Sequence, residues 1–147
     1  MYKILIVDDE SIEREGISFL IEKYKLPLEV AQATNGKTAL EYMRTHPIDI
    51  LLTDVKMPQM DGLELARHTF EKYPDVRILV FSAYGEFEFA KKAMAAQAVS
   101  YLLKPSRSMN SSALWHRFWH GAMSWLKRKK MSSSAARNIV NSFYSAL

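Results

Sequence analysis

The sequence contains no cysteine, which excludes disulfide bonds and thiolate chemistry and is compatible with a reducing compartment. It also has no long apolar run. The N-terminus holds only a brief one, residues 4–7, before two aspartates, and this is neither a signal peptide nor a spanning helix. We therefore expect a cytoplasmic protein without a membrane span. With 147 residues, 48% of them hydrophobic and 24% charged, the chain is typical of one soluble globular domain.

Acidic residues are missing from the last part of the chain. Residues 1–105 carry all 16 Asp and Glu and 13 of the 20 Lys and Arg, whereas residues 106–147 carry seven basic residues, no acid and all three Trp. We expect a domain core that ends at residue 105, then a helix with a basic end at 106–131. A Ser-rich tail at 132–147 is expected to be disordered or weakly helical. A shift of reading frame after about Pro105, or an artificial end, would explain the change in composition.

Short apolar runs alternate with helical patterns before that point. The runs predict strands at residues 2–7, 28–33, 49–53, 76–81 and 99–103. Helical patterns of about ten to fifteen residues separate them. This alternation predicts a parallel sheet and a doubly wound α/β fold.

Four helices are expected between these strands. The first follows Ser11, which is a suitable capping residue, and its apolar positions keep helical spacing: Ile12, Gly16, Phe19, Leu20 and Tyr24. The second follows the turn at residues 35–36, the third begins near Gly62, and the fourth covers residues 86–97.

Polar residues stand where the predicted strands end: Asp8, Asp9, Asp54, Ser82 and Lys104. The carboxyl ends of parallel strands share one edge of the sheet, and ligands bind there. Three carboxylates at one edge repel one another unless a cation intervenes, and such oxygen ligands suit Mg²⁺. A carboxylate beside Mg²⁺ can attack a phosphoryl group, whose oxygens a lysine and a hydroxyl can hold. For Asp54 alone, a loop aspartate with a local turn bond is the alternative.

Four stretches, in this order, resemble the receiver domains of two-component response regulators: residues 6–10 (IVDDE), 54–62 (DVKMPQMDG), 81–84 (FSAY) and 101–105 (YLLKP). The resemblance covers about residues 2–105 and implies a flavodoxin-like, five-stranded parallel sheet with strand order 2-1-3-4-5. Residues around the third stretch are most similar to receivers joined to AraC-type helix-turn-helix output domains. That points to transcription regulation in relatives. The 42 residues after Pro105 show no such output domain, so they do not support DNA binding by this chain.

The resemblance also implies the roles of the acidic residues. Asp54 is expected to accept a phosphoryl group from a sensor histidine kinase. Asp8, Asp9 and Asp54, with the backbone carbonyl of Lys56, are expected to bind Mg²⁺. Such a protein is not an enzyme in the usual sense but a phosphoacceptor that assists its own phosphorylation and dephosphorylation.

Three further residues have roles implied by the same resemblance. Lys104 is expected to pair with the phosphoryl group, Ser82 to supply a hydroxyl that moves onto it, and Tyr101 to act as the aromatic switch. The alternatives are a solvated lysine, a turn serine and an ordinary core aromatic. The face of the fourth helix and fifth strand is a possible dimerisation surface. Gln97 departs from the family, because receivers usually have glycine there to end a helix in the left-handed conformation.

Two other functions stay open. A Mg²⁺-dependent hydrolase with an aspartyl nucleophile normally has a second acid two residues later, where this chain has Lys56. A binder of nucleic acid or of a membrane surface, driven by the basic tail, is the other alternative.

Overall fold

The strands form one parallel sheet. The computed structural model of the chain describes residues 2–23, 25, 28–82 and 100–103. Within them the strand order is β2-β1-β3-β4-β5, and every neighbouring pair is parallel. The strands are β1 (Tyr2–Val7), β2 (Leu28–Ala33), β3 (Ile50–Asp54), β4 (Arg77–Ser82) and β5 (Ser100–Leu103). The predicted doubly wound fold and strand order are confirmed.

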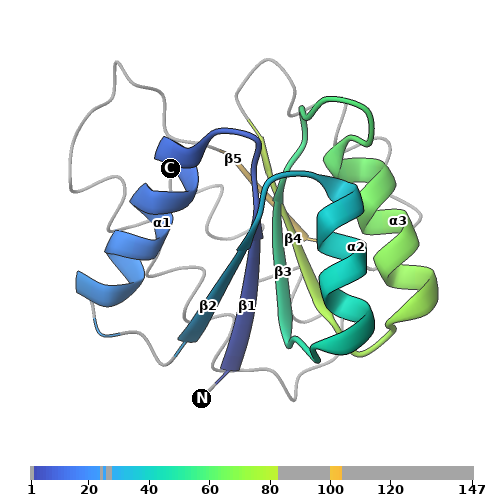
Figure 1. Ribbon diagram of the computed structural model, residues 1–147, viewed down its shortest axis with the longest axis horizontal. Helices are drawn as coiled ribbons and strands as arrows, with labels where there is room; N and C mark the ends of the chain where they lie inside the picture. Colours follow the sequence, from blue (N-terminus) through green and yellow to red (C-terminus); the bar gives the residue numbers. More distant parts are fainter. Residues whose placement is uncertain (1, 24, 26–27, 83–99, 104–147) are drawn as a thin grey trace.

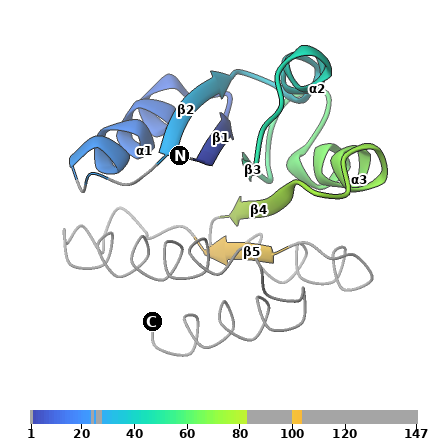
Figure 2. The same cartoon turned by 90° about the horizontal axis from the view of Figure 1, so that it is seen from below.

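Helices cover both faces of this sheet. Helix α1 (Ser11–Lys23) lies on one face, and α2 (Gly36–Thr45) and α3 (Gly62–Lys72) lie on the other (Figures 1 and 2). Local chemistry sets where the last two begin. Asn35 Oδ1 accepts a hydrogen bond from Thr38 N at 2.8 Å, and Asp61 Oδ1 accepts one from Glu64 N at 2.8 Å. Both are N-caps, which satisfy backbone N–H groups that have no partner within the helix.

One described core lies between the sheet and the pair α2 and α3. Alternate strand residues point to opposite faces, and the buried strand residues of this core come mainly from β1, β3 and β4, with Ala33 from β2. They are joined by buried helix residues in one cluster: Leu5, Val7, Leu51, Ile78 and Val80 with Ala39, Met43, Leu65 and Ala66. Ile4, Ile6, Ile50 and Leu52 alternate with these strand residues and are also buried. The central strands are therefore buried on both faces, as expected of a parallel sheet.

The apolar face predicted for the first helix is wrong. Ile12 and Phe19 are 76% and 62% exposed, and α1 instead buries Ile17 and Ile21. Both sets of residues keep helical spacing, so periodicity alone cannot decide between them. The sheet accepts the branched aliphatic pair, which lies one turn apart.

Two strands lie one residue later than predicted. The expected strands at 49–53 and 76–81 are Ile50–Asp54 and Arg77–Ser82, so the last residue of each is the polar one. Other predictions lie outside the described residues: the helix at 86–97 with Gln97, Lys104, and the segments 106–131 and 132–147. In the described part of the chain, no helix is long and apolar enough to cross a membrane.

Candidate functional site

The register of the sheet brings Asp8 and Asp54 to one edge. Val7 pairs with Thr53 across β1 and β3, so the next residue of each strand is an aspartate at the same level. Burial is strong for both, with Asp8 2% exposed and Asp54 8% exposed. Asp9 is exposed at the same edge.

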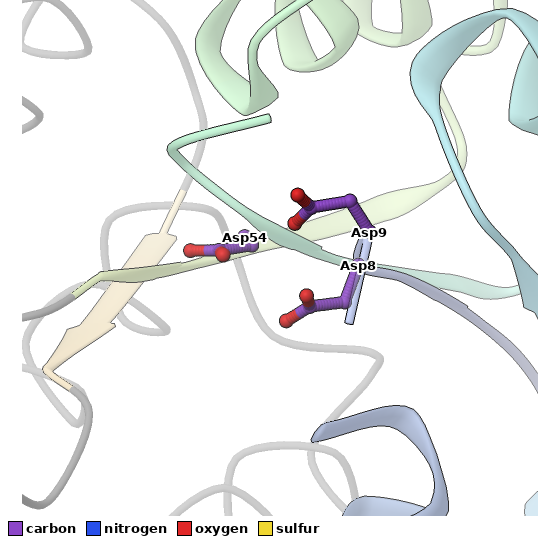
Figure 3. A group of neighbouring side chains, drawn as sticks. All are labelled: Asp8, Asp9 and Asp54. Atoms are coloured by element: carbon purple, nitrogen blue, oxygen red, sulfur yellow. The ribbon is translucent and has the colours of Figure 1, made fainter. Parts of the chain in front are cut away.

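These three residues form an acidic cluster. One carboxylate oxygen from each of Asp8, Asp9 and Asp54 lies within 4.8 Å of the other two. Figure 3 shows their side chains gathered at the ends of β1 and β3. Like charges this close, two of them in buried side chains, repel one another strongly. The donor set is all oxygen, which is what Mg²⁺ prefers, so the three residues fit the divalent cation expected from the sequence.

The main chain around Asp8 is held from three directions. Its N–H donates to Ala33 O at 3.3 Å, its carbonyl oxygen accepts from Arg14 Nη1 at 2.7 Å, and its Oδ1 accepts from Glu10 N at 2.9 Å. The first contact comes from β2, the second from α1 and the third from the turn itself. Asp8 is therefore fixed to two secondary-structure elements besides its own strand.

Close backbone packing fixes the other side of the cluster. Gly62 N donates to Val55 O at 2.8 Å, and Thr53 Oγ1 donates to Asp54 O at 3.0 Å. A Cβ atom built on Gly62 would overlap Asp54 O. The start of α3 therefore lies directly against the backbone of Asp54, and only glycine leaves room for it.

Comparison with known proteins decides the family. Residues 4–113 match the response regulator receiver domain. The chain belongs to this family.

Curated relatives of this receiver domain are regulators. It is 45% identical over 106 residues to the uncharacterized transcriptional regulatory protein YesN of Bacillus subtilis, a match covering 71% of this chain and 29% of the relative. It is 35% identical over 104 residues to the response regulator UvrY of Escherichia coli, covering 71% of this chain and 48% of the relative. The chain thus spans less than half the length of these two relatives.

Solved structures agree. A two component transcriptional regulator AraC from Clostridium phytofermentans superposes with a TM-score of 0.69 at 32% identity, covering 98% of both chains. The response regulator TrrA from Thermotoga maritima, in complex with Mg²⁺ and BeF, superposes with a TM-score of 0.63 at 27% identity, covering 82% of this chain and 98% of that one. The predicted likeness to AraC-type receivers is confirmed, and receivers are phosphoacceptors of two-component signalling.

Of the other predicted site residues, three lie within the described residues and one does not. Lys56 lies exposed in the loop after β3. Ser82 is the last residue of β4 and is paired with Leu103, and Tyr101 in β5 is paired with Val80. Lys104, the residue after β5, lies outside the described residues. Ser82 thus ends its strand at the same edge as the acidic cluster of this receiver domain.

Sequence reasoning missed two residues that shape the site. Arg14 reaches Asp8 O from α1, and Gln59 adopts a left-handed φ of 68° in the loop before α3. Pro58 and Gly62 mark this loop as irregular, but neither φ nor a side-chain-to-backbone bond can be read from one sequence. The signal for Arg14 was its place one helical turn after the acidic stretch.

Proposed function

We propose that this receiver domain accepts a phosphoryl group from a sensor histidine kinase on Asp54. The observation that carries the proposal is the position of Asp54, 8% exposed at the end of β3 and grouped with Asp8 and Asp9. A carboxylate oxygen of Asp54 attacks phosphorus as the bond from phosphorus to the kinase histidine nitrogen breaks. The product is an acyl phosphate, and the released imidazole takes up a proton.

The acidic cluster would hold the Mg²⁺ that this transfer needs. Asp8, Asp9 and Asp54 would supply carboxylate oxygens, and the main-chain carbonyl of Lys56 would supply a fourth ligand. When bound, the cation offsets the negative charge of the carboxylates and of the phosphoryl oxygens. The 4.8 Å grouping of the three carboxylates supports this assignment.

A second set of residues reads the phosphorylated state. Lys104 pairs with the phosphoryl oxygens, the Ser82 hydroxyl moves onto them, and Tyr101 follows as the switch. Phosphorylation adds about −1.5 to −2 charges and biases a two-state surface at the fourth helix and fifth strand, which is also the dimerisation surface. The pairing of Ser82 with Leu103 supports a shared edge, since Lys104 is the next residue.

The proposed cellular location and output of this receiver are inferred from its relatives. The receiver works in the cytoplasm, assists its own phosphorylation and dephosphorylation, and controls an output involved in transcription. The names of YesN and of the AraC regulator support the last point. This chain spans only 29% of YesN. We therefore propose only the class of the output, transcription regulation, and no particular partner.

The test is direct phosphorylation. Incubation with acetyl phosphate and Mg²⁺ should add one phosphoryl group to the intact mass, and chelation of Mg²⁺ should prevent it. Asp54→Asn should show no such gain, because the nucleophile is gone. Asp49→Asn, at the other end of β3, is the matched control and should be labelled like the wild type. Undiminished labelling of Asp54→Asn would exclude Asp54 as the acceptor.

A further inference from the structure

Arg14 links the first helix to the acidic cluster. Its Nη1 donates to the main-chain carbonyl oxygen of Asp8 at 2.7 Å, and its Nε donates to Gln32 Oε1 at 3.1 Å. One guanidinium thus bridges the end of β1 and the neighbouring strand β2. The Asp8 bond is part-buried, where a charged donor to a carbonyl is stronger than in water.

The bridge closes into a ring of hydrogen bonds. Gln32 Nε2 donates to Ser18 Oγ at 3.0 Å, and Ser18 Oγ donates to Arg14 O at 2.9 Å. The ring therefore runs from the Arg14 side chain through β2 and back to the Arg14 backbone one turn along α1. Each hydrogen bond limits the conformations of its partners, so the ring restricts where the guanidinium can lie. The two bonds of Gln32 are exposed, whereas those to Asp8 O and from Ser18 Oγ are part-buried.

We propose that Arg14 is a positioning residue for the cation site, and that the ring with Gln32 and Ser18 holds it in that role. This rests on the proposed function, because Asp8 is there a ligand of Mg²⁺. Arg14 fixes the Asp8 main chain through its carbonyl oxygen, so that the strand end keeps its place against Asp54. It also brings one positive charge to the neighbourhood of three carboxylates.

The chemistry of this position calls for arginine. Two bonds in different directions, to Asp8 O and Gln32 Oε1, use the rigid fork of the guanidinium. A lysine ammonium can donate to the Asp8 carbonyl oxygen but has no second donor fixed in the direction of Gln32. Arg67 offers the contrast: it lies 46% exposed on α3 and makes one weak contact, 3.4 Å, to Glu71.

The experiment measures Mg²⁺ affinity by NMR titration of the backbone amides. Arg14→Met should bind Mg²⁺ about tenfold more weakly, in the range typical for loss of a group that orients a metal ligand. Arg14→Lys should recover part of the affinity, and Gln32→Ala should show a smaller loss than Arg14→Met. Arg67→Met removes the same charge from the surface of α3 and should bind like the wild type.

A second measurement needs no cation. Amide hydrogen exchange of Glu10, whose N–H donates to Asp8 Oδ1 at 2.9 Å, should be faster in Arg14→Met and unchanged in Arg67→Met. If the wild type fails to bind Mg²⁺, the proposed function fails and this exchange still decides the role of Arg14. The proposal is overturned if Arg14→Met matches Arg67→Met in exchange. It is likewise overturned if Gln32→Ala matches the wild type in both measurements.

Discussion

Strand β3 has an aspartate at each end, and the two serve different purposes. Asp49 comes directly before the strand, where its Oδ2 accepts a hydrogen bond from Lys3 N at 2.9 Å. Its backbone N–H donates to Lys3 O at 2.9 Å, and its backbone carbonyl accepts from Arg77 N at 2.9 Å. Asp49 therefore ties β1 and β4 to β3 at the amino end of the sheet.

Asp54 ends the same strand among like charges. It shares the carboxyl edge with Asp8 and Asp9, oxygen atoms within 4.8 Å of one another. One end of β3 thus uses its carboxylate to join strands, and the other concentrates negative charge. A reactive site needs the concentrated negative charge at the carboxyl end of β3. The fold tolerates this charge because the backbone of Asp8 and Asp54 is held by hydrogen bonds and close packing. Removing the carboxylate charge at the two ends should therefore shift the free energy of unfolding in opposite directions.

Gly62→Ala should have the largest effect on stability, because the new Cβ would overlap Asp54 O. We expect a loss of about 3 kcal/mol in the free energy of unfolding, at the upper end of typical overpacking effects. Urea denaturation measures it. Gly16→Ala is the control: among the described residues its Cβ would meet nothing within 4 Å, and alanine at this exposed position of α1 should stabilise the protein by about 0.5–1 kcal/mol. Equal stability of Gly62→Ala and wild type would contradict the close packing at Asp54.

Asp49→Ala should destabilise the domain by about 1.5 kcal/mol, because Lys3 N loses a charged acceptor. Thermal and urea denaturation measure the change. Asp49→Asn keeps an oxygen that can accept the same bond, so its loss should be smaller. If both variants unfold like the wild type, the carboxylate does not hold the amino end of the sheet.

Asp54→Asn should change stability in the other direction. Removing one of three crowded charges should stabilise the protein by up to about 1 kcal/mol when Mg²⁺ is chelated. Added Mg²⁺ should stabilise the wild type more than the variant, so the difference between their free energies of unfolding should become smaller. A lower denaturation midpoint for Asp54→Asn under chelation would show that repulsion is not the dominant effect there.

Much of the fold and of the acidic cluster could be predicted from the sequence. Strands with continuous apolar runs and aspartates at their ends specify a parallel sheet and one shared edge, so the grouping of Asp8, Asp9 and Asp54 was predictable from the residues themselves. The strand order was predictable only through the resemblance to receiver domains. Which face of α1 is buried could not be predicted. Its two candidate faces, one with Ile12 and one with Ile17, share the same period, and only packing against the sheet selects between them.

The backbone conformation of the loops was the second feature that could not be predicted from the sequence. The sequence drew attention to Gln97 as a residue in place of a glycine, and that position lies outside the described residues. The left-handed residues that the structure describes are Lys25 and Gln59, with φ of 50° and 68°. Nothing in a single sequence marks a lysine or a glutamine as left-handed, because the conformation is imposed by the ends that the loop must join.

Gln59→Gly should give the smallest effect, a stabilisation of about 0.5–1 kcal/mol. Gln59 lies exposed in the loop between Asp54 and Gly62, with φ at 68°, a conformation that is unfavourable for any residue with a Cβ. Glycine removes that penalty but gains entropy in the unfolded chain, so the net gain is limited. Gln59→Ala removes the side chain without relieving the backbone and should show no gain. A lower midpoint in urea for Gln59→Gly than for Gln59→Ala would show that side-chain contacts of Gln59, rather than its backbone conformation, govern the loop at the carboxyl end of β3.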